Sequence, residues 1–178
     1  EIIEFFPLFL PGMDGEIAEK FMTIAKKQGL KFRLSTAVKS AKAGKNDVGL
    51  TVTPANGGVE ETIKADIALV SVGRHPATDG LGLEKIGVTM TPRGRIAVDA
   101  RFETSIEDIY AIGDVIDGPM LAHKAEEDAV AAVEMMAGMS GHVDYDLVPG
   151  IVYTAPEIAT LGKSEEALIE AGIDFAKG

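Results

Sequence analysis

This 178-residue sequence predicts an α/β fold, because segments with helical and strand patterns follow one another along it. Apolar residues recur at helical spacing in residues 16–29 and 121–137. Polar and apolar residues alternate on either side of an Asn-Gly-Gly turn in residues 48–65, as they do in a β-hairpin. A continuous apolar run in residues 66–73 is typical of a fully buried strand. We therefore expect an α/β architecture with an antiparallel hairpin inserted.

The first part of the chain predicts a strand, a helix and a second strand. Residues 2–6 form a short apolar strand that contains Glu4. The helix that follows should end near Gly29, since glycine is the usual residue just after a helix. Its expected core positions are Ile17, Phe21, Ile24 and Ala25. Residues 31–44 are the next strand candidate.

The second part predicts further strands and two helices. Residues 95–115 carry two strand patterns, and residues 149–164 carry two more. Leu121–Ala137 forms the longest expected helix, with the acidic residues of the cluster 125–129 (AEEDA) on its solvated face. Its expected buried side consists of Leu121, Ala122, Ala125, Ala129, Val133 and Met136. Ser164 should cap a final helix that has two glutamates in its first turn.

Composition excludes several classes of function. The net charge of −11 argues against nucleic acid or an anionic membrane as the main partner. The chain has no cysteine, so it offers neither a disulfide nor a thiolate nucleophile. Its three histidines do not have metal-ligand spacing, and no metal site is expected. No apolar run is long enough to span a bilayer, and no secretory signal stands at the start. Because both ends have the pattern of regular structure, we expect a segment of a longer protein.

The candidate functional residues lie at the ends of predicted strands. Ligands of open α/β sheets bind at the carboxyl ends of strands. Gly73 and Asp114 each end an apolar run, and Glu4 lies near the end of the first strand. Glycine lets a flat ring approach the backbone, and an aspartate leaving a buried strand needs hydrogen-bond donors such as sugar hydroxyls. The alternatives are a plain turn at Gly73, a structural Asp114 and a solvated Glu4.

The start of the long helix is a further candidate site. Backbone N–H groups there lack partners within the helix, and the helix dipole favours a ligand with partial negative charge. Met120, Leu121, Ala122 and His123 surround this start. The His123 side chain is more typical of a cap or a packed residue than of a catalytic base.

Several segments taken together resemble the pyridine nucleotide-disulfide oxidoreductases. "IYAIGDVIDGPMLAHKAEEDA" is similar to the second flavin-binding segment of that family. "VSVGRHPATDGLGLEKIGV", "RGRIAVDARFETSIEDIYAIGD" and "VPGIVYTAPEIATLGKSEE" are also similar to family members, in the same order along the chain. Within the family, "GPMLAHKAEE" looks most like the members that oxidise dihydrolipoamide, rather than those that reduce glutathione or mercuric ion.

The resemblance implies a role for each candidate residue. Glu4 would bind the adenosine ribose of NAD, and Val38 and Gly73 would line the NAD pocket. Asp114 would bind the ribityl or phosphate part of FAD. The backbone around the start of the long helix would contact the flavin, through Met120, Leu121, Ala122 and His123. No catalytic residue is assigned within this chain.

The resemblance also implies a division into three domains. Residues 1–75 would be the C-terminal half of a Rossmann-like NAD-binding domain. Residues 76–146 would be a central domain carrying the second FAD-binding segment. Residues 147–178 would begin an α+β interface domain that mediates dimerisation.

The implied activity needs parts that this sequence lacks. Family members of the implied kind reoxidise dihydrolipoamide of 2-oxo acid dehydrogenase complexes, passing electrons through a disulfide and FAD to NAD. They act as homodimers, in the bacterial cytoplasm or the mitochondrial matrix. The redox cysteines, both G-x-G-x-x-G turns and the histidine–glutamate pair are absent from the sequence, so this chain alone is expected to be inactive. The alternatives are another flavin disulfide reductase or a non-catalytic interaction module on the same fold.

Overall fold

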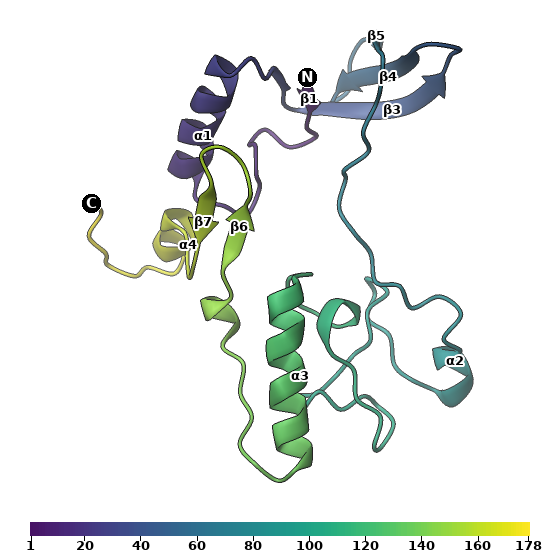
Figure 1. Cartoon of the computed structure of the whole chain (residues 1–178), viewed down its shortest axis with the longest axis vertical. Helices are drawn as coiled ribbons and strands as arrows, with labels where there is room; N and C mark the ends of the chain where they lie inside the picture. The colour runs from purple at the N-terminus through teal and green to yellow at the C-terminus, as the bar shows by residue number, and fades with distance from the viewer. The chain divides into compact units, whose positions relative to one another are not determined.

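A computed structural model describes all residues, 1–178, and its mixed helices and strands confirm the α/β class (Figure 1). The chain divides into two compact units. Unit 1 consists of residues 1–71 and 151–178, and unit 2 consists of residues 72–150. These boundaries fall near two segments rich in Gly, Pro and polar residues, 74–80 and 140–150. None of the helices is both long and apolar enough to cross a membrane.

In unit 1, a helix connects two short parallel strands. β1 (Ile2–Ile3) pairs with β2 (Phe32–Arg33), and α1 (Gly15–Lys27) lies between them in sequence. Parallel neighbours need such a crossover connection, so the predicted strand–helix–strand order is confirmed. Gln28 caps the end of α1, and Gly29 follows with a φ of 97°, as expected for a glycine just after a helix.

The buried face of α1 differs in part from the prediction. Phe21 and Ala25 are buried as expected, but Ile17 and Ile24 are exposed and Ala18 is buried instead. Residues 18, 21 and 25 lie on one line of the helix, because each residue turns it by about 100°. The isoleucines lie beside this line. The small core of the unit covers only the line itself, with Ile158, Phe9 and Phe32 packed around it.

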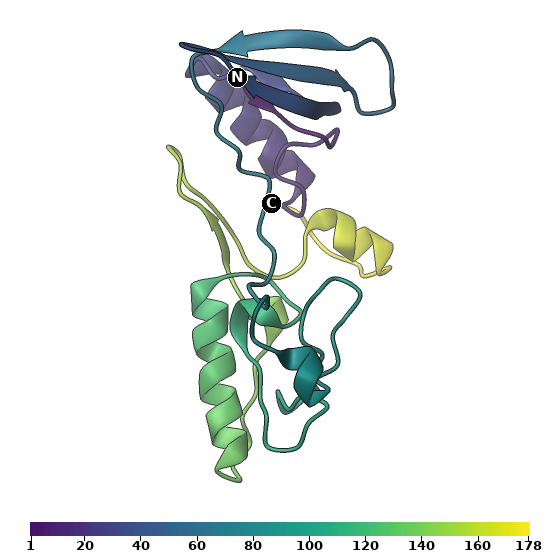
Figure 2. The same cartoon turned by 90° about the vertical axis from the view of Figure 1, so that its right-hand side faces the viewer.

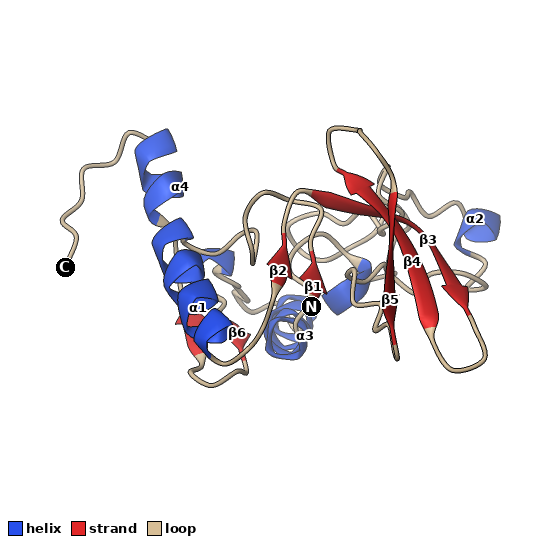
Figure 3. Ribbon diagram, turned by 90° about the horizontal axis from the view of Figure 1, so that it is seen from above, coloured by secondary structure: helices blue, strands red, loops and turns tan.

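A three-stranded antiparallel sheet follows in unit 1 (Figure 3). Its order is β3 (Thr36–Ala43), β4 (Val48–Pro54) and β5 (Glu61–Ala65). The predicted hairpin around the Asn-Gly-Gly turn is therefore confirmed as β4–β5. The two strands predicted in residues 149–164 are observed as β6 (Gly150–Val152) and β7 (Ile158–Thr160), which form a separate two-stranded sheet.

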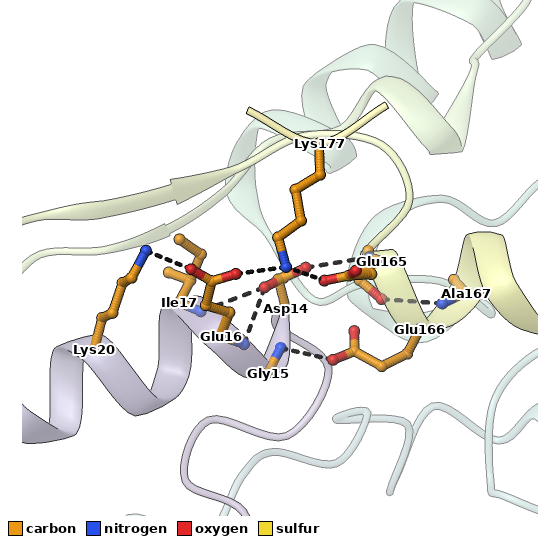
Figure 4. A network of polar contacts seen from close by, with 10 residues as sticks. Asp14, Gly15, Glu16, Ile17, Lys20, Glu165, Glu166, Ala167 and Lys177 are labelled. Atoms are coloured by element: carbon orange, nitrogen blue, oxygen red, sulfur yellow. Dashed lines mark hydrogen bonds and ion pairs between the residues drawn. The ribbon is translucent and has the colours of Figure 1, made fainter. Parts of the chain in front are cut away.

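Polar contacts hold the starts of α1 and α4 (Glu165–Glu170) together (Figure 4). Asp14 caps α1 by accepting the N–H groups of Glu16 and Ile17, and its other carboxylate oxygen accepts the N–H of Glu165 at 3.1 Å. These backbone donors, first of all that of Glu165, lower the pKa of Asp14. Ser164 accepts the N–H of Ala167, which confirms the predicted cap of α4.

Unit 2 is built around α3 (Ala122–Met136), which runs alongside the loops of the unit (Figure 2). The observed bounds confirm the predicted helix, with Leu121 and Ala137 as its cap residues. Shorter elements are α2 (Leu83–Ile86) and the 3₁₀ turns η1 (Gly113–Val115) and η2 (Tyr145–Leu147). The core consists of Val88, Ile96, Phe102, Ala111, Ile116, Ala131 and Ala132.

Two strand predictions are wrong. Residues 66–73 form no strand, and Ile67, Leu69, Val70 and Val72 are 76–91% exposed. A continuous apolar run is buried as a strand only within a sheet that is covered on both faces, and no strand of this chain pairs with it. Residues 95–115 form only the isolated bridges Met90–Ile96 and Glu103–Tyr110, because turns interrupt the pairing after single residues.

Candidate functional site

The predicted site residues fall into two groups, one in each unit. Glu4 and Val38 lie in unit 1. The others, in unit 2, are Gly73, Asp114, Met120, Leu121, Ala122 and His123.

The start of α3 has the open backbone groups that the sequence predicted. Leu121 is the N-cap residue, with extended backbone and a side chain that offers no hydrogen-bond acceptor to the first turn. The N–H groups of the first turn of a helix have no partner within it, and they carry the positive end of the helix dipole. Ala122 is exposed and Leu121 is partly exposed, so this start is accessible. It can receive a ligand group with partial negative charge.

A hydrogen bond brings the loop after Gly73 to the start of α3. The Arg74 guanidinium donates to the carbonyl of Met120 at 3.3 Å, so two segments predicted separately lie together. Gly73 itself is exposed, which corrects its predicted place at the end of a buried strand. Its φ of +106° is one that residues with a side chain rarely adopt, and no atom lies within 4 Å of the position of a Cβ. The position thus requires glycine and leaves open space above it.

Asp114 is exposed in the 3₁₀ turn η1, directly after the buried Gly113. The prediction that it leaves a buried strand is wrong, because the segment before it makes only an isolated bridge. Its carboxylate makes no hydrogen bond or ion pair with the rest of the chain. A free carboxylate next to a buried turn can accept hydrogen bonds from the hydroxyl groups of a ligand.

His123 is engaged within unit 2. Its Nε2 lies 2.9 Å from the carbonyl oxygen of Pro149, and this nitrogen carries the proton because a carbonyl oxygen only accepts. The bond connects the first turn of α3 to the segment before β6. This contact agrees with the interpretation of the side chain as a packed residue rather than a base.

A buried ion pair in α3 was not predicted. Lys124 and Asp128 lie one turn apart, with Nζ 2.7 Å from Oδ2, and both side chains are 0% exposed. Asp128 belongs to the acidic cluster that was expected on the solvated face, so that expectation is wrong for this residue, although Glu126 and Glu127 are exposed. The predicted buried stripe is also wrong, because Ala122, Val133 and Met136 are exposed and the other three residues are only partly buried. The buried residues of α3 are Lys124, Asp128, Ala131 and Ala132.

The ion pair holds Gly113 and Tyr145. Asp128 accepts the N–H of Gly113 at 2.9 Å and the hydroxyl of Tyr145 at 2.8 Å. Lys124 donates to the carbonyl of Gly113 at 3.1 Å. Burial raises the pKa of Tyr145, and its hydrogen bond to Asp128 raises that pKa further. One sequence signal could have revealed the pair: Lys124 and Asp128 stand at positions i and i+4, in line with Ala131 and Ala132.

In unit 1, Glu4 lies directly after β1, so it stands at a strand end, although this strand is shorter than the predicted one of residues 2–6. One carboxylate oxygen accepts the N–H of Phe6 at 3.0 Å. The backbone of Glu4 bonds Arg33 and Thr36, so the residue is held between neighbouring segments. Val38 is half-exposed on β3, at the point where the register with β4 shifts.

A pocket lies elsewhere in unit 2. It has a volume of about 410 Å³ and is lined by Ile96, Phe102, Ile116 and Met135 among others. None of the predicted site residues lines it. The candidate site in unit 2 is therefore an open surface at the start of α3, next to the turn that carries Asp114.

Comparisons with known proteins show what this chain is similar to. The family model described as "Pyridine nucleotide-disulphide oxidoreductase" matches residues 1–129. The chain is 52% identical over 177 residues to "Dihydrolipoyl dehydrogenase, mitochondrial" of Pisum sativum. The matched region covers 99% of this chain and 35% of that protein. It is 50% identical over 168 residues to the protein of the same name from Homo sapiens, covering 94% of this chain and 33% of the other.

The solved structures similar to this chain agree with the family match. The HOCl-induced flavoprotein disulfide reductase RclA from Escherichia coli superposes with a TM-score of 0.84 at 30% sequence identity. The superposition covers 97% of this chain and 39% of that one. The chain thus spans about a third of the length of the curated relatives it matches.

Proposed function

The chain belongs to the pyridine nucleotide-disulphide oxidoreductase family, and from this premise we propose that it is part of a dihydrolipoyl dehydrogenase. The observation that carries the proposal is its 52% identity to the Pisum sativum enzyme across 99% of the chain. The whole protein would reoxidise dihydrolipoamide to lipoamide and reduce NAD to NADH with release of a proton. Bound FAD would supply the relay of electrons between a redox disulfide and NAD. This chain has no cysteine and contributes none of that disulfide.

We propose that the residues of unit 2 bind FAD. The residues present fit this group, because the Asp114 carboxylate is exposed without an internal partner and can accept hydrogen bonds from ribityl hydroxyls. The uncapped start of α3 suits the partially negative pyrimidine edge of the flavin. Met120, Leu121 and Ala122 would contact it through their backbone. His123 would do the same, since its ring is bonded to Pro149.

We propose that Glu4, Val38 and Gly73 bind NAD. The parallel strands β1 and β2 with α1 between them support residues 1–75 as part of a Rossmann-like NAD-binding domain. An acid at a strand end in such a domain accepts hydrogen bonds from the ribose hydroxyls. The Glu4 carboxylate, which has two oxygens and uses one for Phe6, has room for them.

The remaining assignments follow the same relatives. Residues 76–146 would form the central domain, and residues 147–178, with β6, β7 and α4, would begin the dimerisation domain. The whole protein would be a homodimer that works with components of a 2-oxo acid dehydrogenase complex and with lipoamide. Names such as that of the Pisum sativum enzyme favour the mitochondrial matrix, and the bacterial cytoplasm is the alternative.

A second candidate function is that of another flavin disulfide reductase. It is favoured by the close superposition on RclA, although the sequence identity there is 30%. Turnover decides between the two. The complete protein should form NADH from dihydrolipoamide, and it should not reduce glutathione disulfide or mercuric ion at a comparable rate. A colourless protein without turnover would instead support a non-catalytic interaction module.

Asp114→Ala tests the FAD assignment in the complete protein. Hydrogen bonds to a charged group contribute about 1.5–3 kcal/mol each. Losing one should weaken FAD retention about ten- to a hundredfold, since 1.4 kcal/mol corresponds to tenfold. Flavin content after dialysis is the measurement. Asp79→Ala, at another exposed aspartate of unit 2, is the matched control. Unchanged retention in Asp114→Ala would remove Asp114 from the site.

Glu4→Gln tests the NAD assignment. The negative charge of Glu4 repels the 2′-phosphate of NADP, and residues 4–12 contain no Arg or Lys to receive it. The wild-type protein should therefore prefer NAD. Glu4→Gln should narrow the preference, chiefly by raising kcat/KM for NADP. Glu60→Gln, at an exposed residue outside the strands, should leave the ratio unchanged. An unchanged ratio in Glu4→Gln would leave Glu4 a solvated residue.

A further inference from the structure

The turn that carries Asp114 is held from both sides of Gly113 by one buried ion pair. Asp128 accepts the N–H of the peptide that enters Gly113, at 2.9 Å. Lys124 donates to the carbonyl of the peptide that leaves it toward Asp114, at 3.1 Å. Fixing both peptides fixes the two dihedral angles of Gly113 between them. The direction in which the Asp114 side chain leaves the backbone is thereby set.

The backbone of Gly113 depends on this support. Its φ is +72°, in the left-handed region that favours glycine, and a Cβ there would come within 3.0 Å of the Cβ of Ala125 in α3. The turn therefore packs directly against the helix. Glycine is the least restrained residue of the chain in its backbone, so without partners on both peptides it would leave Asp114 free to reorient.

The rest of the turn is held by a second cation. Arg95 donates to the carbonyls of Ile116 at 3.2 Å and Gly118 at 2.9 Å. Gly118 packs against the side chain of Lys124, since a Cβ at Gly118 would be 3.0 Å from the Cε of Lys124. Residues 113–118 are thus fixed between Arg95 on one side and α3 on the other.

Packing alone does not account for a charged pair at this position. Burying two ions is costly, and apolar residues of similar volume are often equally stabilising or more so. Apolar side chains could not bond the buried N–H of Gly113, which needs an acceptor, whereas its carbonyl also accepts the N–H of Ile116 at 3.3 Å. Charge-assisted hydrogen bonds are directional and strong, so they suit a group that must hold one orientation.

We propose that Lys124, Asp128 and Tyr145 are positioning residues that aim the Asp114 carboxylate at FAD. The inference rests on the proposed function, which puts FAD beside Asp114. Tyr145 contributes by donating to the second oxygen of Asp128 at 2.8 Å, which orients that carboxylate toward Gly113. None of the three side chains is required to touch FAD.

A double-mutant cycle in the complete flavoprotein tests the proposal. The measured quantities are the rate of FAD release, followed by the rise in flavin fluorescence, and the visible circular dichroism of the bound flavin. Asp128→Asn and Asp114→Asn should each speed FAD release about tenfold. Because Asp128 acts through Asp114, the double variant should release FAD no faster than Asp114→Asn alone. Glu127→Gln, at the exposed neighbour in α3, should match the wild type.

Tyr145→Phe keeps the test decisive if Asp128→Asn fails to fold. It removes one hydrogen bond and leaves the ion pair in place. We expect FAD release about threefold faster in the wild-type background and unchanged in the Asp114→Asn background. Lys124→Arg keeps the cation, and it should restore most of the retention that Lys124→Met loses.

The outcomes separate this proposal from the proposed function. Additive effects of Asp114 and network variants on FAD release, or an unaltered flavin dichroism in Asp128→Asn, would overturn the positioning role alone. A wild-type complete protein that carries no flavin would overturn the proposed function, and this inference with it.

Discussion

Removing both charges of the buried pair in α3 should cost less stability than the two single removals added together. Asp128→Leu keeps the branched shape of the side chain and leaves the Lys124 ammonium, which is 0% exposed, without a counter-charge. Removing one partner of a buried pair costs about 3–5 kcal/mol. Lys124→Met should cost a similar amount, because the Asp128 carboxylate then keeps only its bonds to Gly113 and Tyr145.

The double variant Lys124→Met/Asp128→Leu leaves no buried ion without a counter-charge. Its remaining cost is that the N–H of Gly113 and the hydroxyl of Tyr145 lose their acceptor, at about 1–3 kcal/mol for a buried group. The carbonyl of Gly113 keeps the N–H of Ile116 at 3.3 Å. We therefore expect the double variant to cost about 2–3 kcal/mol less than the sum of the two single variants, which is within the range of coupling between residues in contact.

Native-state hydrogen exchange of the α3 amides in the complete protein without added cofactor is the assay. It reports the opening free energy of this element, whereas global unfolding of a protein with several domains mixes the domains together. Cofactor is left out because a bound ligand raises the apparent stability. Glu127→Gln should stay within about 0.5 kcal/mol of the wild type, as an exposed substitution does. A single-variant cost as small as that of the control, or strictly additive costs, would refute the reasoning.

Three further predictions concern a glycine, a tyrosine and a glutamate. Gly113→Ala should lower the opening free energy of α3, measured by native-state hydrogen exchange, by more than Gly94→Ala does. Both glycines have a φ near +72°, which costs about 1–2 kcal/mol for a residue with a Cβ, but only at Gly113 would the Cβ contact a neighbour, so equal losses would contradict the close packing against α3. Tyr145 should ionise at higher pH than a free tyrosine in an ultraviolet absorbance titration, because burial and then Asp128 raise its pKa. The folded state thus favours the neutral phenol. The contribution of Tyr145 to folding stability is complete below the ordinary pKa of 10.0 and is lost as pH rises above that value. Asp128→Asn should lower the titration midpoint of Tyr145, and an ordinary midpoint in the wild type would disprove the contact. The hydrogen bond from Lys177, followed by that from Lys20, lowers the pKa of Glu16 from 4.5 to about 2, so the contribution of Glu16 to stability is present above pH 4.5 and is lost as pH falls toward 2. NMR titration of its carboxyl carbon should show this midpoint rising in high salt, and a salt-independent midpoint near 4.5 would contradict the pairing.

Local patterns were sufficient for the elements that need only nearby residues. α1 and α3 were predicted because apolar spacing and the glycine after α1 act within a few turns of the helix. The β4–β5 hairpin follows from alternation around a glycine-rich turn, and Ser164 caps α4 through a contact three residues away. The same kind of information, in longer motifs, identified the family.

The candidate site was predicted only in outline. The open start of α3 and the strand-end position of Glu4 follow from sequence order, and both are observed. The exposure of Asp114 was not predicted, because an apolar run before an acid does not reveal whether other strands pair with that run. The approach of Arg74 to Met120 joins residues 46 positions apart, and no local pattern contains it.

The sequence by itself therefore determined the order and type of the main elements and the family, since these depend on periodicity, caps and motifs read along the chain. Tertiary structure alone decided which faces are buried. Residues 66–73 have the composition of a core strand and are exposed, because no strand of this chain pairs with them. Asp128 is of a residue type that is usually solvated, yet it is buried, because Lys124, Gly113 and Tyr145 surround its carboxylate with donors. Burial depends on the neighbours that folding brings together. Neighbouring donors can compensate a buried charge, and an apolar run without neighbours stays exposed.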